Sequence, residues 1–307
     1  MLHLDLVPGL TPLLLSEQQV PTRVISADNF RAVIKTMIAN RAGATDHERV
    51  AFIVGQYLAA GGFLSAREEL DLYAAMVSGC ADTGYRSVAF KPHPSAPAGQ
   101  LAELRDVAQD RGVRFTVADE RELAEVWFER GRVELVVGCF STALMTATSL
   151  YGLPVARLGT ELMLERLTPF QDSNRIPVTL VDALVPDLTS LARTGKESRH
   201  STPDEVHTLV TAVGYAMQPV KLTARRPAAA SFLAAHYNSH SRYFKRRRLT
   251  VLDLPGRLPV QPRPKPTVWR RVRGRVRRAW KELGRRLPGT HQPPLSFDTV
   301  APRRPEL

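Results

Sequence analysis

Short apolar runs alternate with helical patterns from residue 50 onward, and this alternation limits the possible folds more than any other feature of the chain. The predicted strands are residues 50–55, 88–90, 113–117, 135–138 and 155–158, with a sixth candidate at 178–180. Nearly continuous apolar strands separated by helices are typical of a parallel sheet that is covered on both faces. The sequence therefore predicts an α/β fold, with a Rossmann-like parallel sheet and helices on both faces.

Capping residues and apolar spacing place the helices between and beyond these strands. Ser65 begins a Ser-x-x-Glu capping box, in which two side chains bond the first free amides of a helix, and Thr202 is expected to cap the last helix. The predicted helices include residues 29–38, 100–109, 142–151 and 203–217.

Polar motifs follow two of the predicted strands at the points where these strands end. A Lys-Pro-His-Pro motif at residues 91–94 follows the second strand, and Ser141-Thr142 follows the fourth. Open α/β sheets bind ligands beyond the carboxyl ends of their strands, so both motifs are expected to face one crevice. The prolines hold His93 extended, and its imidazole can donate a proton to a phosphate oxygen, with positive charge added by Lys91.

Ser141 and Thr142 stand at the start of a predicted helix. A helix N-terminus has free backbone N–H groups and the positive end of the helix dipole, and hydroxyl groups there complete an anion site suited to phosphate. The same two residues also fit a plain N-cap, and the two roles are compatible.

Gln56 follows the first predicted strand in the same way. Its amide can hydrogen-bond a nucleobase or a sugar, although a solvated loop residue fits the sequence equally well. Glu68 and Glu69 lie near the start of the next helix, where a capping and helix-surface role is favoured over a contact with ribose or base.

Several classes of protein are disfavoured by what the sequence lacks. Cys80 and Cys139 are isolated in apolar surroundings, which predicts buried free thiols. No apolar run approaches the ~20 residues of a membrane-spanning helix, and the N-terminus has no signal-peptide pattern. The dinucleotide, Walker, zinc-protease and esterase motifs do not occur, and without Asp-x-Asp or a His/Cys cluster no metal ion is implied.

Three elements occur together in this chain: the strand that ends in Gly55-Gln56, the His-Pro motif at 91–94 and the Ser/Thr motif within 140–144. Their combination resembles the bacterial alpha-2,8-polysialyltransferase family, whose members are GT-B type sialyltransferases. The resemblance covers roughly residues 45–220. It implies a nucleotide-sugar donor, CMP-sialic acid, a glycan acceptor, no cofactor, and a role in the biosynthesis of cell-surface polysaccharide such as capsule.

The resemblance also assigns roles to individual residues. In the family the histidine of the His-Pro motif contacts the CMP phosphate and serves as general acid toward the leaving CMP, which implies this role for His93. The Ser/Thr motif holds the same phosphate, which implies that Ser141 and Thr142 are binding residues. Lys91 and Gln56 are further candidates for the donor site.

One motif of the family does not occur in this chain. The family carries an Asp/Glu-Asp/Glu-Gly motif in its N-terminal domain, whose carboxylate is the general base on the acceptor hydroxyl. The sequence therefore predicts the C-terminal half of a GT-B fold, with 1–45 as a remnant of the N-terminal domain or a linker and 46–222 as the donor-binding domain. A fragment or a donor-binding remnant of this kind is expected to bind nucleotide without full transfer.

Residues 223–307 are predicted to be a basic, partly disordered tail rich in Pro and Arg. Residues 225–307 hold 21 of the 42 Lys and Arg residues but only four of the 30 Asp and Glu, which gives +17 there against −5 in the rest of the chain. Little structure is expected over 225–266.

The segment 267–287 has apolar residues, two of them Trp, at steps of three or four, opposite a face rich in Arg. A basic amphipathic helix of this kind is typical of an anionic membrane surface, which predicts a cytoplasmic protein that is peripheral on the inner face of the plasma membrane. A disordered tail, or a helix packed on its own protein, is the alternative. Nucleic acid is disfavoured as a partner because no stacking platform accompanies the charge.

Two other functions remain open at this point. Transferases of the teichoic-acid type, which use CDP-activated polyol phosphate, also resemble GT-B proteins with a His-Pro motif and a Ser-rich helix start. A non-catalytic membrane-surface protein with a vestigial nucleotide pocket is the other alternative.

Overall fold

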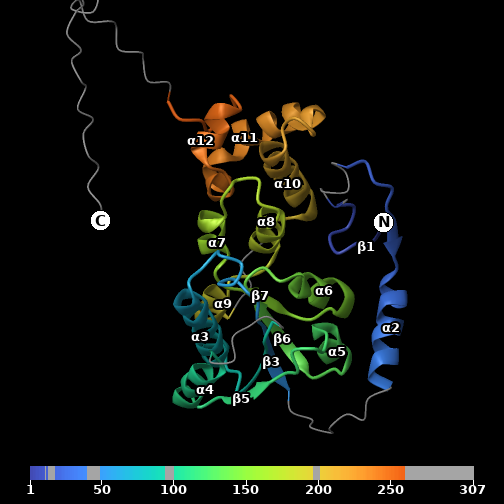
Figure 1. Cartoon of the computed structure of the whole chain (residues 1–307), viewed down its shortest axis with the longest axis vertical. Helices are drawn as coiled ribbons and strands as arrows, with labels where there is room; N and C mark the ends of the chain where they lie inside the picture. The colour runs from blue at the N-terminus through green and yellow to red at the C-terminus, as the bar shows by residue number, and fades with distance from the viewer. Residues whose placement is uncertain (11, 13–17, 40–48, 94–99, 196–200, 260–307) are drawn as a thin grey trace, which may run out of the picture. The chain divides into compact units, whose positions relative to one another are not determined.

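A five-stranded parallel sheet with helices on both faces forms the body of the protein in the computed structural model, which describes residues 1–10, 12, 18–39, 49–93, 100–195 and 201–259 (Figure 1). The strands are β3 (Val50–Val54), β4 (Ser87–Lys91), β5 (Arg114–Val117), β6 (Val133–Gly138) and β7 (Val155–Arg157). Every neighbouring pair is parallel, which confirms the predicted fold class.

The order of the strands is β5-β4-β3-β6-β7. From β3 the chain moves outward on one side through β4 to β5, then returns to β6 on the other side of β3 and continues to β7. The direction of this progression reverses between β3 and β6, and ligands bind at such a reversal, beyond the carboxyl ends of the strands. A ligand site is therefore expected at the loops that follow β3, β4 and β6.

The helices cover the two faces of the sheet. Figure 1 shows α3, α4 and α9 on one face and α5 and α6 on the other. These helices are α3 (Ala66–Asp82), α4 (Gln100–Asp110), α5 (Ala124–Glu129), α6 (Thr142–Tyr151) and α9 (Leu188–Thr194). The predicted capping box is present: Ser65 Oγ accepts from the Glu68 amide at 3.2 Å, and Glu68 accepts from the Ser65 amide at 2.7 Å.

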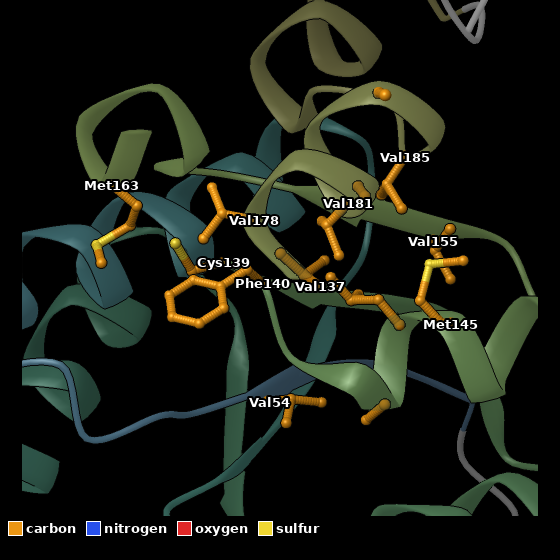
Figure 2. Close-up of a cluster of buried hydrophobic side chains, with 14 of the residues drawn as sticks. Val54, Val137, Cys139, Phe140, Met145, Val155, Met163, Val178, Val181 and Val185 are labelled. Atoms are coloured by element: carbon orange, nitrogen blue, oxygen red, sulfur yellow. The ribbon is translucent and has the colours of Figure 1, made fainter. Parts of the chain in front are cut away.

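The carboxyl ends of the central strands rest on a dense apolar core. Figure 2 shows Val137 of β6 and Val155 of β7 beside Met145 of α6 and Val181 of α8 (Arg175–Leu184). Because every residue of β3 is buried, this strand is shielded on both sides of the sheet, as expected for a central parallel strand. Both cysteines are buried free thiols, as predicted.

The sixth predicted strand, at 178–180, is wrong, because these residues lie inside α8. The buried Val178 and Val181 are three residues apart, which is the spacing of one helix face. A short apolar run cannot separate a buried strand from a buried helix segment. Pro177 does not interrupt the helix because it stands in the first turn, where no intrahelical donor is lost.

The prediction of little structure over 225–266 is also wrong for its first part. The chain continues through α7 (Thr160–Arg166), α10 (Pro203–Met217), α11 (Arg226–His240) and α12 (Arg246–Val251), joined by short 3-10 turns at Thr223–Arg225 and Ser241–Tyr243. Apolar side chains after residue 225 join the core, among them Phe232, Leu233, Tyr243, Phe244, Leu249 and Leu254. The compact unit therefore extends from Met1 to Leu258.

The basic run at 245–248 serves this packing. Arg248 donates to the carbonyls of Ala216 and Met217 at 2.7 and 3.3 Å, where α10 ends and its last carbonyls lack helical partners. Lys245 donates to the carbonyl of Glu165 at 3.1 Å. Side chains that the composition assigned to a solvated tail thus bind backbone carbonyls of the folded body.

Residues near the N-terminus form a second, small sheet. β1 (Leu2–Leu4) pairs in parallel with β2 (Arg23–Ile25), and α2 (Ala27–Ala39) follows. Helix α2 packs on α5, where Arg31 pairs with Glu129 at 3.0 Å. Residues 1–45 were predicted to be a remnant of an N-terminal domain or a linker. In the structure, α2 of this segment packs on α5, one of the helices that cover the main sheet. Residues 267–287, the predicted amphipathic helix, lie outside the described residues.

Candidate functional site

Gly55 joins the ends of β3 and β4. Its amide donates to the Lys91 carbonyl at 2.8 Å, and a Cβ at this position would lie only 2.9 Å from that oxygen. Such a distance is shorter than ordinary van der Waals contact, so only glycine allows the two strand ends to approach this closely. The His-Pro motif therefore begins directly beside the residues that follow β3.

Gln56, the next residue, reaches in the opposite direction. Its side-chain oxygen accepts a hydrogen bond from the Phe140 amide at 2.9 Å, one residue before Ser141. Gln56 thus crosses the reversal between β3 and β6 and fixes the loop that carries the Ser/Thr motif. Because its oxygen has this role, its NH₂ group is the part of the amide left for a base or a sugar.

Tyr57 completes the connection to the His-Pro motif. Its ring lies 4.3 Å from the His93 ring, centroid to centroid, with an angle of 40° between the planes. Two consecutive residues after β3 therefore contact both predicted motifs, one on each side. The structure brings His93, Gln56 and the start of the Ser/Thr motif into one neighbourhood, as the crevice prediction requires.

Two side chains of α3, those of Glu69 and Tyr73, hold this loop in place. The helix-surface role predicted for Glu69 is wrong, because its side chain is buried, and no sequence pattern indicated Tyr73. The Glu69 carboxylate, only 2% exposed, accepts from the Leu58 amide at 2.8 Å and the Ala59 amide at 3.0 Å. The Tyr73 hydroxyl accepts from the Gln56 amide at 2.7 Å. Its single proton lies between two acceptors, the Gln56 carbonyl at 2.6 Å and Glu69 Oε1 at 2.8 Å. Burial raises the pKa of Tyr73, so its hydroxyl stays protonated and can donate.

Ser141 and Thr142 occupy the start of α6. Ser141 Oγ accepts from the Ala143 amide at 3.3 Å, which is the N-cap geometry, and Thr142 is exposed in the first turn. The helix has ten residues and begins beside the Gln56 contact. A free hydroxyl and the positive end of a helix dipole are thus presented at the reversal between β3 and β6.

The electrostatics of the His-Pro motif set the protonation state of His93. Burial lowers the pKa of His93, and the charge of Lys91 lowers it further, while Glu69 acts in the opposite direction. The Lys91 ammonium donates to the Glu120 carbonyl at 3.2 Å, so it points toward the loop after β5. His93 is therefore mainly neutral at pH 7 before any anion binds.

A cavity with a volume of about 680 Å³ lies elsewhere, beyond the end of β7. No residue predicted for the donor site lines it. Among the described residues, no group of three or more His, Cys, Asp or Glu side chains has an arrangement that would hold a metal ion. No helix within them is both long and apolar enough to span a membrane.

A test of the strand-end geometry uses two glycines at the ends of neighbouring strands. Gly55→Ala should lower the free energy of unfolding by about 1–3 kcal/mol, because its methyl group meets the Lys91 carbonyl. At Gly138 the nearest atom to an added Cβ is 3.5 Å away, so Gly138→Ala should cost less than about 1 kcal/mol. Urea unfolding of both variants measures this, and equal losses would contradict the close approach at Gly55.

The sequence matches one family of known proteins over about half of its length. The family model described as Alpha-2,8-polysialyltransferase (POLYST) matches residues 1–160. The match includes the strand ends with Gln56, His93 and Ser141, and it also includes residues 1–45, which the resemblance described above left out. No curated protein and no solved structure matches the chain. The chain belongs to the alpha-2,8-polysialyltransferase family.

Proposed function

We propose that the chain binds CMP-sialic acid at the ends of β3, β4 and β6 and is the donor-binding part of a sialyltransferase in the synthesis of cell-surface polysaccharide. Membership of the family supports a sialyltransferase-like function, with a nucleotide-sugar donor and a glycan acceptor. The observation that carries the location is the pair Gln56–Tyr57, which contacts the Ser/Thr loop and His93 at the same time.

In this proposal both motifs contact the phosphate of the leaving nucleotide. The phosphate of CMP lies at the N-terminus of α6, where backbone amides, the helix dipole and the Thr142 hydroxyl favour an anion. His93 donates a proton or a hydrogen bond to the same phosphate as the bond to the sugar breaks. The imidazole of His93 and the N-terminus of α6 stabilise the negative charge of the phosphate, so the proposed transfer uses no metal ion.

The packing of His93 against Tyr57 supports a role as general acid. The contact limits the orientations open to the imidazole, and a fixed orientation favours general acid catalysis. The lowered pKa leaves His93 neutral in the free protein, and the negative charge of an incoming phosphate favours the protonated form. Binding of the donor would therefore load His93 with the proton that the leaving group takes.

Calorimetry with CMP, CDP and CMP-sialic acid tests the proposed site. We expect CMP and CMP-sialic acid to bind the full chain in the presence of EDTA, and His93→Ala to slow release of CMP from the donor by about 10²–10⁴-fold. Thr208→Ala, a substitution on α10 away from the three strand ends, is the control. No binding of any nucleotide would contradict the proposal, and a strong preference for CDP would favour transfer of polyol phosphate instead.

The protonation of His93 can be followed by NMR. We expect its titration midpoint to lie below the ordinary value of about 6.5, since burial and Lys91 both disfavour the imidazolium. Lys91→Met removes a positive charge and should raise this midpoint. Arg49→Met removes an exposed positive charge before β3, at the other end of that strand, and should leave it unchanged. An unchanged or lower midpoint in Lys91→Met would contradict the assigned electrostatics.

We also propose that residues 267–287 attach the protein to the inner face of the plasma membrane. The support is the sequence pattern of this segment, in which two Trp residues and an apolar stripe oppose an Arg-rich face. The full chain should co-sediment with anionic vesicles and much less with neutral ones, and replacement of Arg271, Arg275 and Arg278 by Gln should weaken this binding. Equal partitioning to both kinds of vesicle would contradict the proposal.

A further inference from the structure

The cavity beyond β7 has a wall made of polar side chains from several elements. Arg157 ends β7, Asp187 precedes α9, and Arg242 and Tyr243 come from the 3-10 turn after α11. The volume of about 680 Å³ lies within the range of small-molecule sites, roughly 300–1,000 Å³. Helices that the sequence analysis did not predict, α11 and the turn after it, thus complete one side of this cavity.

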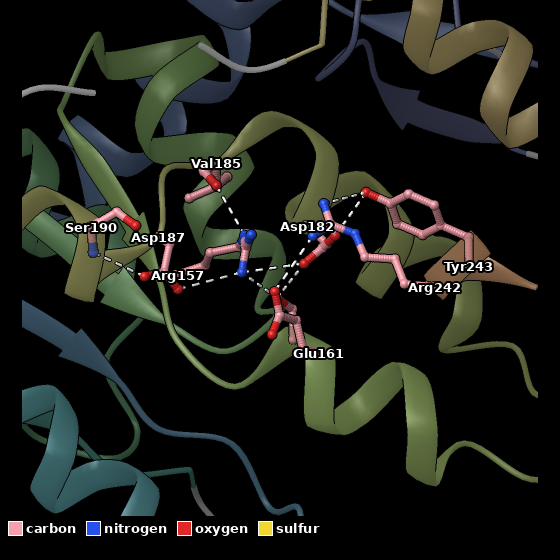
Figure 3. Close-up of polar contacts among 9 residues, drawn as sticks. Arg157, Glu161, Asp182, Val185, Asp187, Ser190, Arg242 and Tyr243 are labelled. Carbon is pink, nitrogen blue, oxygen red and sulfur yellow. Dashed lines mark hydrogen bonds and ion pairs between the residues drawn. The ribbon is translucent and has the colours of Figure 1, made fainter. Parts of the chain in front are cut away.

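A buried ion-pair network fixes the wall (Figure 3). The Asp182 carboxylate, which is fully buried, pairs with Arg157 at 3.2 Å and with Arg242 at 2.8 Å. It also accepts hydrogen bonds from the hydroxyls of Thr160 at 2.6 Å and Tyr243 at 2.7 Å. Every oxygen of Asp182 therefore has partners, and the side chains around it are held in fixed positions before any ligand arrives.

The charges along the wall nearly cancel. Three carboxylates, those of Glu161, Asp182 and Asp187, face two guanidinium groups, those of Arg157 and Arg242. Burial lowers the pKa of the neighbouring His240, so its imidazole adds little positive charge at pH 7. Because the described residues of the wall carry no positive excess, they disfavour phosphate and other small anions, and the paired carboxylates leave little attraction for a cation.

Hydroxyl groups make up much of the remaining wall. They belong to Thr189, Ser190, Ser201 and Ser239. Together with the carboxylates of Glu161 and Asp187 and the two guanidinium groups they present hydrogen-bond acceptors and donors side by side. A neutral ligand that itself carries many hydroxyl groups satisfies both kinds, which is the chemistry of a carbohydrate.

Two contacts tie the wall of the cavity to the segment that precedes the proposed phosphate site. The Leu158 amide donates to the Gly138 carbonyl at 3.1 Å, which ties the residue after β7 to the end of β6. Gly159 has a positive φ of 91°, and a Cβ there would lie 3.4 Å from Cys139 Sγ. Cys139 is two residues before Ser141, so the cavity and the start of α6 lie at adjacent strand ends on one edge of the sheet.

We propose that this cavity binds a neutral carbohydrate unit of the acceptor glycan. The carbohydrate class rests on the charge balance and the hydroxyl groups of the cavity alone. The assignment to the acceptor also rests on the proposed function, because it requires a donor at the neighbouring strand ends.

Binding of lactose to the full chain, followed by saturation-transfer NMR without any nucleotide, tests the carbohydrate class. Ser239→Trp places an indole at the cavity wall and should weaken lactose binding by about tenfold or more, which is about 1.4 kcal/mol. Asn238→Trp adds the same group at an exposed position of the same helix and should leave binding unchanged. Glu161→Gln, at a side chain that is 71% exposed, should also weaken binding without disturbing the core.

CMP binding by the same variants separates this proposal from the proposed function. We expect CMP affinity to be the same in wild type, Ser239→Trp and Asn238→Trp. No lactose binding by the wild type, or equal binding by Ser239→Trp, would overturn the carbohydrate site. Loss of CMP binding in Ser239→Trp alone would show that the cavity takes the nucleotide, which would also overturn it. If lactose binds as expected but CMP does not bind at all, the carbohydrate site stands while the donor site fails.

Discussion

The buried carboxylate of Glu69 and the hydroxyl of Tyr73 that contacts it are the interactions on which the candidate site depends. Glu69 binds two backbone amides of the loop after β3, and Tyr73 binds the amide and carbonyl of Gln56. Hydrogen bonds to a charged group are worth about 1.5–3 kcal/mol each, and an unpaired buried carboxylate would be costly. The loop is thus held firmly enough for Gln56 and Tyr57 to contact motifs from the strands on either side.

The sequence indicated candidate site residues at the ends of strands, because the end of an apolar run is local information. His93, Gln56, Ser141 and Thr142 were predicted in this way, and their position at one edge of the sheet follows from the parallel strands. The partner of Gln56 was not predictable, since Phe140 lies 84 residues away. Glu69 was assigned to a helix surface because its neighbour Glu68 is a capping residue, and only tertiary packing decides which of the two faces inward.

The fold was predictable to a similar degree and for the same reason. The bounds of α6 and α10 agree with the prediction, because Ser141, Thr202 and the glycine after α6 are capping residues whose effect is local. The strand predicted at 178–180 was wrong because burial on one face of a helix resembles a short strand. The arginines after residue 225 suggested a solvated tail, whereas Arg248 binds the carbonyls at the end of α10, which composition cannot reveal.

The central claim is that three separate strand ends form one nucleotide site. Hydrogen–deuterium exchange of the full chain with and without CMP tests it most directly, because the backbone amides of each loop report separately. The account predicts that CMP slows exchange together at residues 56–59, 91–93 and 140–143. Slowing confined to the residues around Arg157 and Arg242, or to one of the three loops, would contradict it.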